Sequence, residues 1–121
     1  MIIDTAKHMK EYQKGIVDCW TLVQDIHKDN GIILPDYIDV NSASKRNTFK
    51  EQMTDIVEYE ELDHLERGAL ILFESNPWHC GIAIDDAKMI HRAEGINTRI
   101  ERVDRYGKKV AGIYLVKRLN P

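Results

Sequence analysis

The first clear pattern in the chain is an apolar stripe at helical spacing. It recurs at positions i, i+3, i+4 and i+7 and consists of Cys19, Leu22, Val23 and Ile26. This spacing places the four side chains on one face of a helix. Asp18 is suited to cap the start of that helix, and Asn30-Gly31 is suited to end it.

Weaker helical patterns lie on either side of this stripe. A short helix is expected over residues 4–13, and a second helix over residues 44–57 with Phe49, Met53, Ile56 and Val57 as its buried face. Between them "IILPDY" is expected to be extended, because Pro35 restricts the residue before it. The acidic stretch "EYEELDHLE" at residues 58–66 is expected to be a solvated loop or turn.

From Arg67 onward the pattern changes to strands. The segments that favour strands are "ALILFE", "HCGIAI", "KMIHRA", "INTRIERV" and "VAGIYLV". Helices followed by an antiparallel sheet indicate an α+β fold, with the N-terminal helices packed on one face of about five strands. The length of 121 residues and the absence of a linker predict a single domain over residues 1–121.

Composition and charge narrow the range of partners. The net charge is −3, and no run of basic residues is longer than two, which argues against nucleic acid as a partner. No apolar run is long enough to predict insertion into a membrane. The first residues, "MIIDTAKHMKEYQKG", lack the apolar core of a signal peptide, so synthesis and retention in the cytoplasm are expected.

The two cysteines, Cys19 and Cys80, are interpreted as free thiols, because a cytosolic chain of this size seldom uses a disulfide. His79 and Cys80 are adjacent, but neighbouring strand residues point to opposite faces, and no C-x-x-C pair is present. The pattern therefore predicts neither a metal site nor a cofactor.

The five histidines fall into two groups. His8, His27 and His64 lie in polar surroundings or on the polar side of a helix, and solvated side chains are expected for them. His79 and His91 lie within apolar, strand-like sequence instead. Two strand histidines that converge would indicate a site.

Their convergence depends on the turn between the two strands. A three-residue loop at residues 85–87 would pair Ile84 with Lys88 and Gly81 with His91, so that His79 and His91 share a face at about 7–8 Å between Cα atoms. A two-residue loop would put them on opposite faces. The first register is favoured, because the small Gly81 and Ala83 on the His79 face leave room for a helix.

With the Cys19 end of the first helix packed on that face, a cysteine and two histidines would line up. This is the general arrangement of a nucleophile, a base and an orienting group. The free N–H groups at the helix start, near Asp18 and Cys19, favour a thiolate and are suited to bind an oxyanion. Cys80 points to the other face and is interpreted as a core residue behind the site.

Three segments together resemble the NlpC family of papain-like cysteine peptidases: "DCWTLVQDIHKDNGIILP", "LERGALILFE" and "WHCGIAIDDAKMIH". The order of Cys19, His79 and His91 agrees with the family pattern. Ala69 stands where the family usually has aspartate, and Cys80 stands where it usually has valine. Trp20, where secreted members usually have serine, and the continuation "LPDY" are more similar to the phage tail members.

The resemblance implies a papain-like NlpC fold and a peptidoglycan endopeptidase that cuts stem peptides between γ-D-glutamyl and a diamino acid. Cys19 would be the nucleophile, His79 the base and His91 the orienting residue. Tyr12, Trp20 and Trp78 are candidates for lining the substrate site, although core or partner packing is favoured for Trp20.

A phage tail member would be made in the host cytoplasm and would reach the cell wall in the virion, with other tail proteins as partners. Two alternatives remain open: an inactive structural or assembly protein of the tail tip, and a thiol-dependent acyltransferase or amidase.

Overall fold

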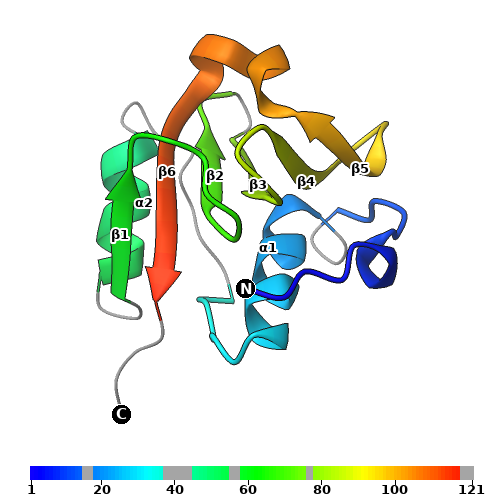
Figure 1. Cartoon of the computed structure of the whole chain (residues 1–121), viewed down its shortest axis with the longest axis horizontal. Helices are drawn as coiled ribbons and strands as arrows, with labels where there is room; N and C mark the ends of the chain where they lie inside the picture. Colours follow the sequence, from blue (N-terminus) through cyan, green and yellow to red (C-terminus); the bar gives the residue numbers. More distant parts are fainter. Residues whose placement is uncertain (15–17, 37–44, 55–57, 76–77, 118–121) are drawn as a thin grey trace.

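The computed structural model describes residues 1–14, 18–36, 45–54, 58–75 and 78–117 (Figure 1). Its helical segments are the 3₁₀ helix η1 (Ala6–His8), the α-helices α1 (Cys19–Asp29) and α2 (Lys45–Thr54), and the 3₁₀ helix η2 (Val103–Lys109). Its strands are β1 (Glu58–Leu62), β2 (Leu70–Phe73), β3 (His79–Ala83), β4 (Lys88–Ala93), β5 (Asn97–Arg102) and β6 (Val110–Lys117).

The six strands form one sheet in the order β1-β6-β2-β3-β4-β5, and all neighbouring strands are antiparallel. The last strand, β6, runs between β1 and β2, while η2 crosses one end of the sheet from β5 to β6 (Figure 1). The α+β class and the antiparallel sheet predicted from the sequence are confirmed. None of the helices in the described residues is long and apolar enough to cross a membrane.

Helix α1 has the predicted limits because both of its ends carry matching side chains. At the start, the Asp18 carboxylate accepts a hydrogen bond from the Thr21 N–H at 2.9 Å, and the Asp18 N–H donates to the Thr21 hydroxyl at 2.8 Å. This reciprocal capping box satisfies two backbone donors that a helix start leaves unpaired. At the other end, Asn30 caps the helix and Gly31 adopts a positive φ of 77°, which glycine tolerates.

Both faces of the sheet are covered. The larger core, on the side of α1 and α2, contains Trp20, Leu22, Val23, Ile26, Phe49, Met53, Leu70, Leu72, Cys80, Ile82, Ile90 and Tyr114. The smaller core, on the side of η2, contains Ala69, Ile71, Phe73, Ala83, Met89 and Val103. The alternation of strand side chains between two faces explains why β2 is buried along its whole length.

The first of the two helices expected beside α1 is shorter than predicted. Only the single 3₁₀ turn η1 forms within the helix expected over residues 4–13. The second helix, α2, begins at Lys45 and ends at Thr54. Its predicted apolar residues Phe49 and Met53 are buried, whereas the other two, at positions 56 and 57, lie outside the described residues.

The prediction of a solvated loop at residues 58–66 is wrong for its first half. Residues Glu58–Leu62 form β1, an edge strand paired with β6. Tyr59 packs against the core while its glutamate neighbours remain exposed. Charged side chains are common on edge strands, where they discourage pairing with other chains, so a high density of glutamate did not exclude a strand.

The predicted register of the hairpin between β3 and β4 is confirmed. Gly81 pairs with His91, and the Ile84 N–H donates to the Lys88 carbonyl at 2.9 Å. The face on which α1 packs, however, was predicted wrongly. Helix α1 contacts the side that carries Cys80 and Ile82, and the side that carries Gly81 and His91 faces η2.

The small residue at position 81 has a different cause from the predicted helix contact. A Cβ atom built on Gly81 would lie 3.1 Å from the Cβ of His91 and 3.1 Å from the Ile90 carbonyl oxygen. Gly81 therefore makes room for the neighbouring strand and its histidine.

Candidate active site

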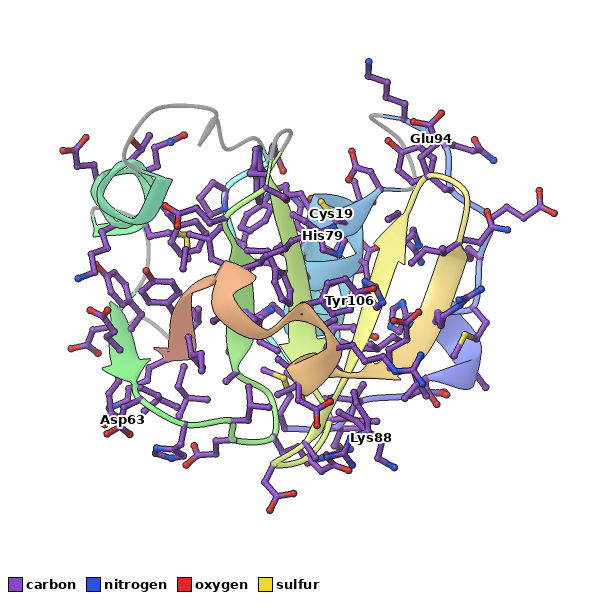
Figure 2. All side chains as sticks on the ribbon, turned by 90° about the horizontal axis from the view of Figure 1, so that it is seen from above. Cys19, Asp63, His79, Lys88, Glu94 and Tyr106 are labelled. Carbon is purple, nitrogen blue, oxygen red and sulfur yellow. The ribbon has the colours of Figure 1, made fainter. Side chains whose placement is uncertain are left out.

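Cys19 is the first residue of α1 and lies where that helix meets the start of β3. Its side chain is half-buried and packs against the larger core, which includes Cys80. Figure 2 shows Cys19 and His79 side by side at the end of the sheet where α1 begins. His79 is the first residue of β3, and its side chain interacts with the thiol of Cys19, which packs on the α1 side of the sheet.

His79 also contacts His91, as the strand register predicted. The His79 Nε2 and His91 Nδ1 atoms are 2.8 Å apart, and the two rings meet edge to face with centroids 5.1 Å apart. His79 is half-buried, whereas His91 is only 1% exposed. Because Nε2 of His79 is engaged with His91, Nδ1 is the nitrogen left to interact with the Cys19 thiol.

The surroundings of Cys19 favour its thiolate. A hydrogen bond with the Cys80 thiol, together with the hydrogen bond and positive charge of His79, outweighs burial and lowers the pKa of Cys19 to about 5. Full burial raises the pKa of Cys80 well above its ordinary value, so Cys80 stays a neutral donor. The pair therefore consists of one thiolate and one thiol at neutral pH.

The start of α1 supplies backbone donors next to this thiolate. The capping box uses the N–H of Thr21, the third residue of the helix. A helix also leaves the N–H groups of its first two residues without intrahelical partners, here Cys19 and Trp20. The Cys19 N–H is thus placed to stabilise negative charge on an oxygen next to Sγ.

A cavity of about 640 Å³ opens at these residues. Tyr12, Trp78, Ser75 and Ile96 line its walls, together with charged groups of both signs: Lys14, Lys109, Arg92, Asp18, Asp36 and Glu94. The volume is within the usual range for a small-molecule or peptide site. A mixture of apolar walls and both charges suits a ligand that carries carboxylates and amines.

Tyr12 is held at this cavity by the first two residues of β5. The Tyr12 N–H donates to the Asn97 side-chain oxygen at 3.0 Å, and the Thr98 hydroxyl donates to the Lys10 carbonyl at 2.8 Å. Asn97 adopts a positive φ of 54°, a strained conformation that asparagine tolerates better than most residues. Tyr12 is thus one of the residues that line the cavity next to Cys19.

The two predicted tryptophans have different surroundings. Trp20 is only 6% exposed, donates from Nε1 to the Pro35 carbonyl at 2.9 Å, and packs edge-on against Phe49. Trp78 is half-buried at the cavity and lies 6.2 Å from Trp20 between ring centroids. Trp20 packs in the core, which is one of the two roles that the sequence favoured for it. Trp78 is the better candidate for contacting a ligand.

The prediction that His8 and His27 are solvated is wrong. His8 is 3% exposed and lies 2.8 Å from an Asp29 carboxylate oxygen, and His27 is fully buried with Nδ1 2.7 Å from the Val23 carbonyl oxygen. His27 lies within α1 and His8 lies in η1 against Asp29 of that helix, and the polar sequence neighbours of both gave no sign of burial. His64 is exposed, as predicted.

Three residues near the histidine pair escaped the sequence analysis. Cys80 was assigned only to the core, yet its thiol contacts Cys19. Glu101 of β5 and Tyr106 of η2 lie next to His91. The alternation of the β5 segment and its pairing with β4 would have placed Glu101 on the His91 face, whereas an irregular 3₁₀ segment gives no periodic signal for Tyr106.

Within the described ranges, no group of three or more histidine, cysteine, aspartate or glutamate side chains could hold a metal ion.

Comparison with protein families gives a match over most of the chain. The model of the NlpC/P60 family matches residues 8–115, which include Cys19, His79, His91 and nearly the whole sheet. Comparison with curated proteins gives no match. Members of the NlpC/P60 family are typically cysteine peptidases that act on the peptides of the bacterial cell wall. On the strength of a family match that covers most of its length, the chain belongs to the NlpC/P60 family.

Proposed function

We propose that this chain is a cysteine endopeptidase that hydrolyses peptidoglycan stem peptides between a γ-D-glutamyl residue and a diamino acid. The observation that carries the proposal is the row formed by Cys19, His79 and His91, with 2.8 Å between the two histidines. The lowered pKa of Cys19, to about 5, supports its role as the nucleophile.

The proposed reaction follows the usual two steps of a thiol peptidase. The Cys19 thiolate attacks the carbonyl carbon of the peptide bond, and the Cys19 N–H stabilises the resulting oxyanion. Protonated His79 gives its Nδ1 proton to the leaving amine, so the C–N bond breaks and a thioester remains on Cys19. His79 then takes a proton from water, the hydroxide attacks the thioester, and the carboxylate product leaves with the thiolate restored.

The cavity supports a substrate of this class. A stem peptide cut next to a diamino acid carries carboxylates and an amine within a few bonds of the reacting carbonyl. The cavity offers cations at Lys14 and Lys109 and anions at Asp36 and Glu94, which suit such mixed charges. Burial and the nearby charges raise the pKa of Tyr12, so its hydroxyl stays protonated and able to donate a hydrogen bond.

The direct test is digestion of purified peptidoglycan, followed by mass spectrometry of the released peptides. We expect the native chain to release fragments that end in γ-D-glutamate and fragments that begin with the diamino acid. The Cys19→Ala variant should release neither, and Glu60→Gln, a change on the exposed strand β1, should behave as the native chain.

Other results would exclude the proposal in distinct ways. Equal release by Cys19→Ala would reject Cys19 as the nucleophile. Transfer of the acyl group to an added amine, without hydrolysis, would indicate an acyltransferase. Absence of any product from a folded chain would favour a structural protein that keeps the fold.

We further propose that the peptidase is carried in a phage tail, where it serves cell-wall penetration or tail assembly together with other tail proteins. This extension rests on the similarity of Trp20 and "LPDY" to phage tail members. Mass spectrometry of purified virions tests it, with the chain expected in tail fractions. Its absence from intact virions and from tail intermediates would reject this extension and leave the peptidase proposal in place.

A further inference from the structure

The carboxylate of Glu101 lies on the side of His91 that faces away from His79. His91 Nδ1 is 2.8 Å from His79 Nε2, while His91 Nε2 is 3.8 Å from Glu101 Oε2. The His91 ring therefore stands between a histidine and a carboxylate. Glu101 thus extends the row formed by Cys19, His79 and His91 by one more group.

The buried position of His91 gives this contact its importance. The ring is 1% exposed, and its Nε2 has no hydrogen-bond partner within the described parts of the chain. A buried polar atom without a partner is costly, by about 1–3 kcal/mol. The Glu101 carboxylate, itself only 10% exposed, is the charged group at ion-pair distance from this atom. A small approach of the two groups would complete a hydrogen bond.

Glu101 is held in place and stays ionised. The Tyr106 hydroxyl donates to its Oε2 at 2.9 Å, and Arg99 Nη1 donates to its Oε1 at 3.3 Å. Burial alone would raise the pKa of Glu101, but the hydrogen bond from Tyr106 and the hydrogen bond and charge of Arg99 outweigh it and leave the pKa below its ordinary value. Tyr106 also packs its ring edge-to-face on His91, with centroids 5.6 Å apart.

His91 itself is neutral at physiological pH. Burial and the positive charge of His79 lower the pKa of His91 to about 4, although Glu101 acts in the opposite direction. A neutral imidazole carries its proton on only one nitrogen. The position of that proton therefore decides what His91 does to His79.

We propose that Glu101 is a positioning residue that keeps the proton of His91 on Nε2, and this role rests on the function proposed above. With the proton on Nε2, the lone pair on His91 Nδ1 accepts the Nε2–H of His79. His79 then has Nδ1 free to take the proton of Cys19 and to hold it for the leaving amine.

The opposite tautomer would block that chemistry. With the proton on Nδ1, His91 would donate to Nε2 of His79, and a neutral His79 would have to carry its own proton on Nδ1. Nδ1 would then be unable to accept a proton from Cys19. The same tautomer would point the Nε2 lone pair of His91 at the Glu101 carboxylate, which is electrostatically unfavourable. The carboxylate thus selects the productive state.

The test measures the tautomer directly, by two-bond ¹H–¹⁵N correlation spectra of the histidine rings at neutral pH. In the native chain we expect His91 to be protonated on Nε2. In Glu101→Leu and Glu101→Gln a substantial share should shift to Nδ1. The rate of Cys19 alkylation by iodoacetamide at pH 6 should also fall roughly twofold, because a rise of one pKa unit from about 5 lowers the thiolate share at that pH from about nine-tenths to about one-half.

Two further variants separate this role from a structural one. Tyr106→Phe removes the hydroxyl that orients the carboxylate and should shift the tautomer in the same direction by a smaller amount. Glu60→Gln, on an exposed strand edge, should change neither measurement. Circular dichroism identifies which variants are folded, and Glu101→Gln, which keeps the shape of the side chain, stands in if Glu101→Leu fails to fold.

His91 protonated on Nε2 in the folded Glu101 variants, with unchanged alkylation, would overturn the proposal. Neither measurement needs a substrate, so failure of the peptidase proposal would show itself separately, as absence of peptide release. Conversely, an unchanged tautomer together with full peptide release would remove only the role of Glu101.

Discussion

The thiols of Cys19 and Cys80 meet where the first turn of α1 packs on the start of β3, and the hydrogen bond between them is the largest influence that lowers the pKa of Cys19. Cys80 is fully buried and belongs to the core. A residue that would serve as plain core filling in another chain thus supports the thiolate here. This contact leads to the first prediction.

Replacing Cys80 by valine should raise the pKa of Cys19, because valine fills similar space but offers no hydrogen bond. We expect the midpoint of Cys19 alkylation to move upward from about 5, with His79 still holding it below the ordinary thiol value of roughly 8.5. The pH dependence of iodoacetamide labelling, read by peptide mass mapping, measures this. A midpoint identical to that of the native chain would show that Cys80 is only core filling.

The role of His91 predicts different effects for two substitutions. In His91→Asn the side-chain amide can occupy the position of Nδ1 and keep an acceptor for His79, whereas His91→Leu removes it. We expect His91→Leu to lose on the order of 10²–10⁴-fold in peptide release, the usual contribution of acid–base catalysis. His91→Asn should retain clearly more activity. Equal losses in both variants, with folding intact, would contradict an orienting role.

Stability should depend on pH through the same histidine. The pKa of His91 is about 4 in the folded chain and 6.5 ordinarily, so between these values the unfolded chain binds more protons. Stability therefore falls as the pH is lowered from 6.5 to 4. Urea unfolding at several pH values measures this. The free energy of unfolding of the native chain, minus that of His91→Asn, should decrease as the pH is lowered from 6.5 to 4.

His64 provides a control of opposite sign. A hydrogen bond that His64 donates to the Asp63 carboxylate raises the pKa of His64, so any stability that it contributes is present below pH 6.5 and is lost as the pH rises. His64→Asn should therefore leave the acid slope in place. If the loss of stability at acid pH disappears in His64→Asn but persists in His91→Asn, it does not come from His91, and the prediction is wrong.

The start of β5 should control substrate binding through Tyr12. Glycine adopts the positive φ of position 97 without strain, but Asn97→Gly removes the oxygen that accepts the Tyr12 N–H. Asn97→Asp keeps an acceptor at this place. We expect Asn97→Gly to raise KM severalfold with little change in kcat, and Asn97→Asp to resemble the native chain. Steady-state kinetics on a soluble stem peptide measures both. An unchanged KM in Asn97→Gly would separate Tyr12 from substrate binding.

The parts of the fold that the sequence predicted well are those with periodic or local signals. The helix stripe and its caps defined α1, and the turn at residues 85–87 correctly placed His79 beside His91. The strand β1 was missed because its glutamates hide the alternation that Tyr59 provides. The face of the sheet on which α1 packs was predicted wrongly. A small residue such as Gly81 indicates that another group lies close to it, but not whether that group is a helix or a neighbouring strand.

The site divides in the same way. The contact between His79 and His91 could be predicted because strand parity follows from the sequence. Glu101 needed the pairing of β4 with β5, and Tyr106 needed an irregular connection between distant strands. The contact between Cys19 and Cys80 depends on where the helix end meets the sheet, which is a tertiary property.

The most direct test of the account is the pH dependence of Cys19 alkylation in the native chain. We predict that the rate of labelling at Cys19 rises with a midpoint near pH 5, while Cys80 stays unlabelled in the folded protein because it is fully buried. The labelled residue is identified by peptide mass mapping. A single midpoint near the ordinary thiol value of roughly 8.5 would contradict the claim that His79 and Cys80 hold Cys19 as a reactive thiolate.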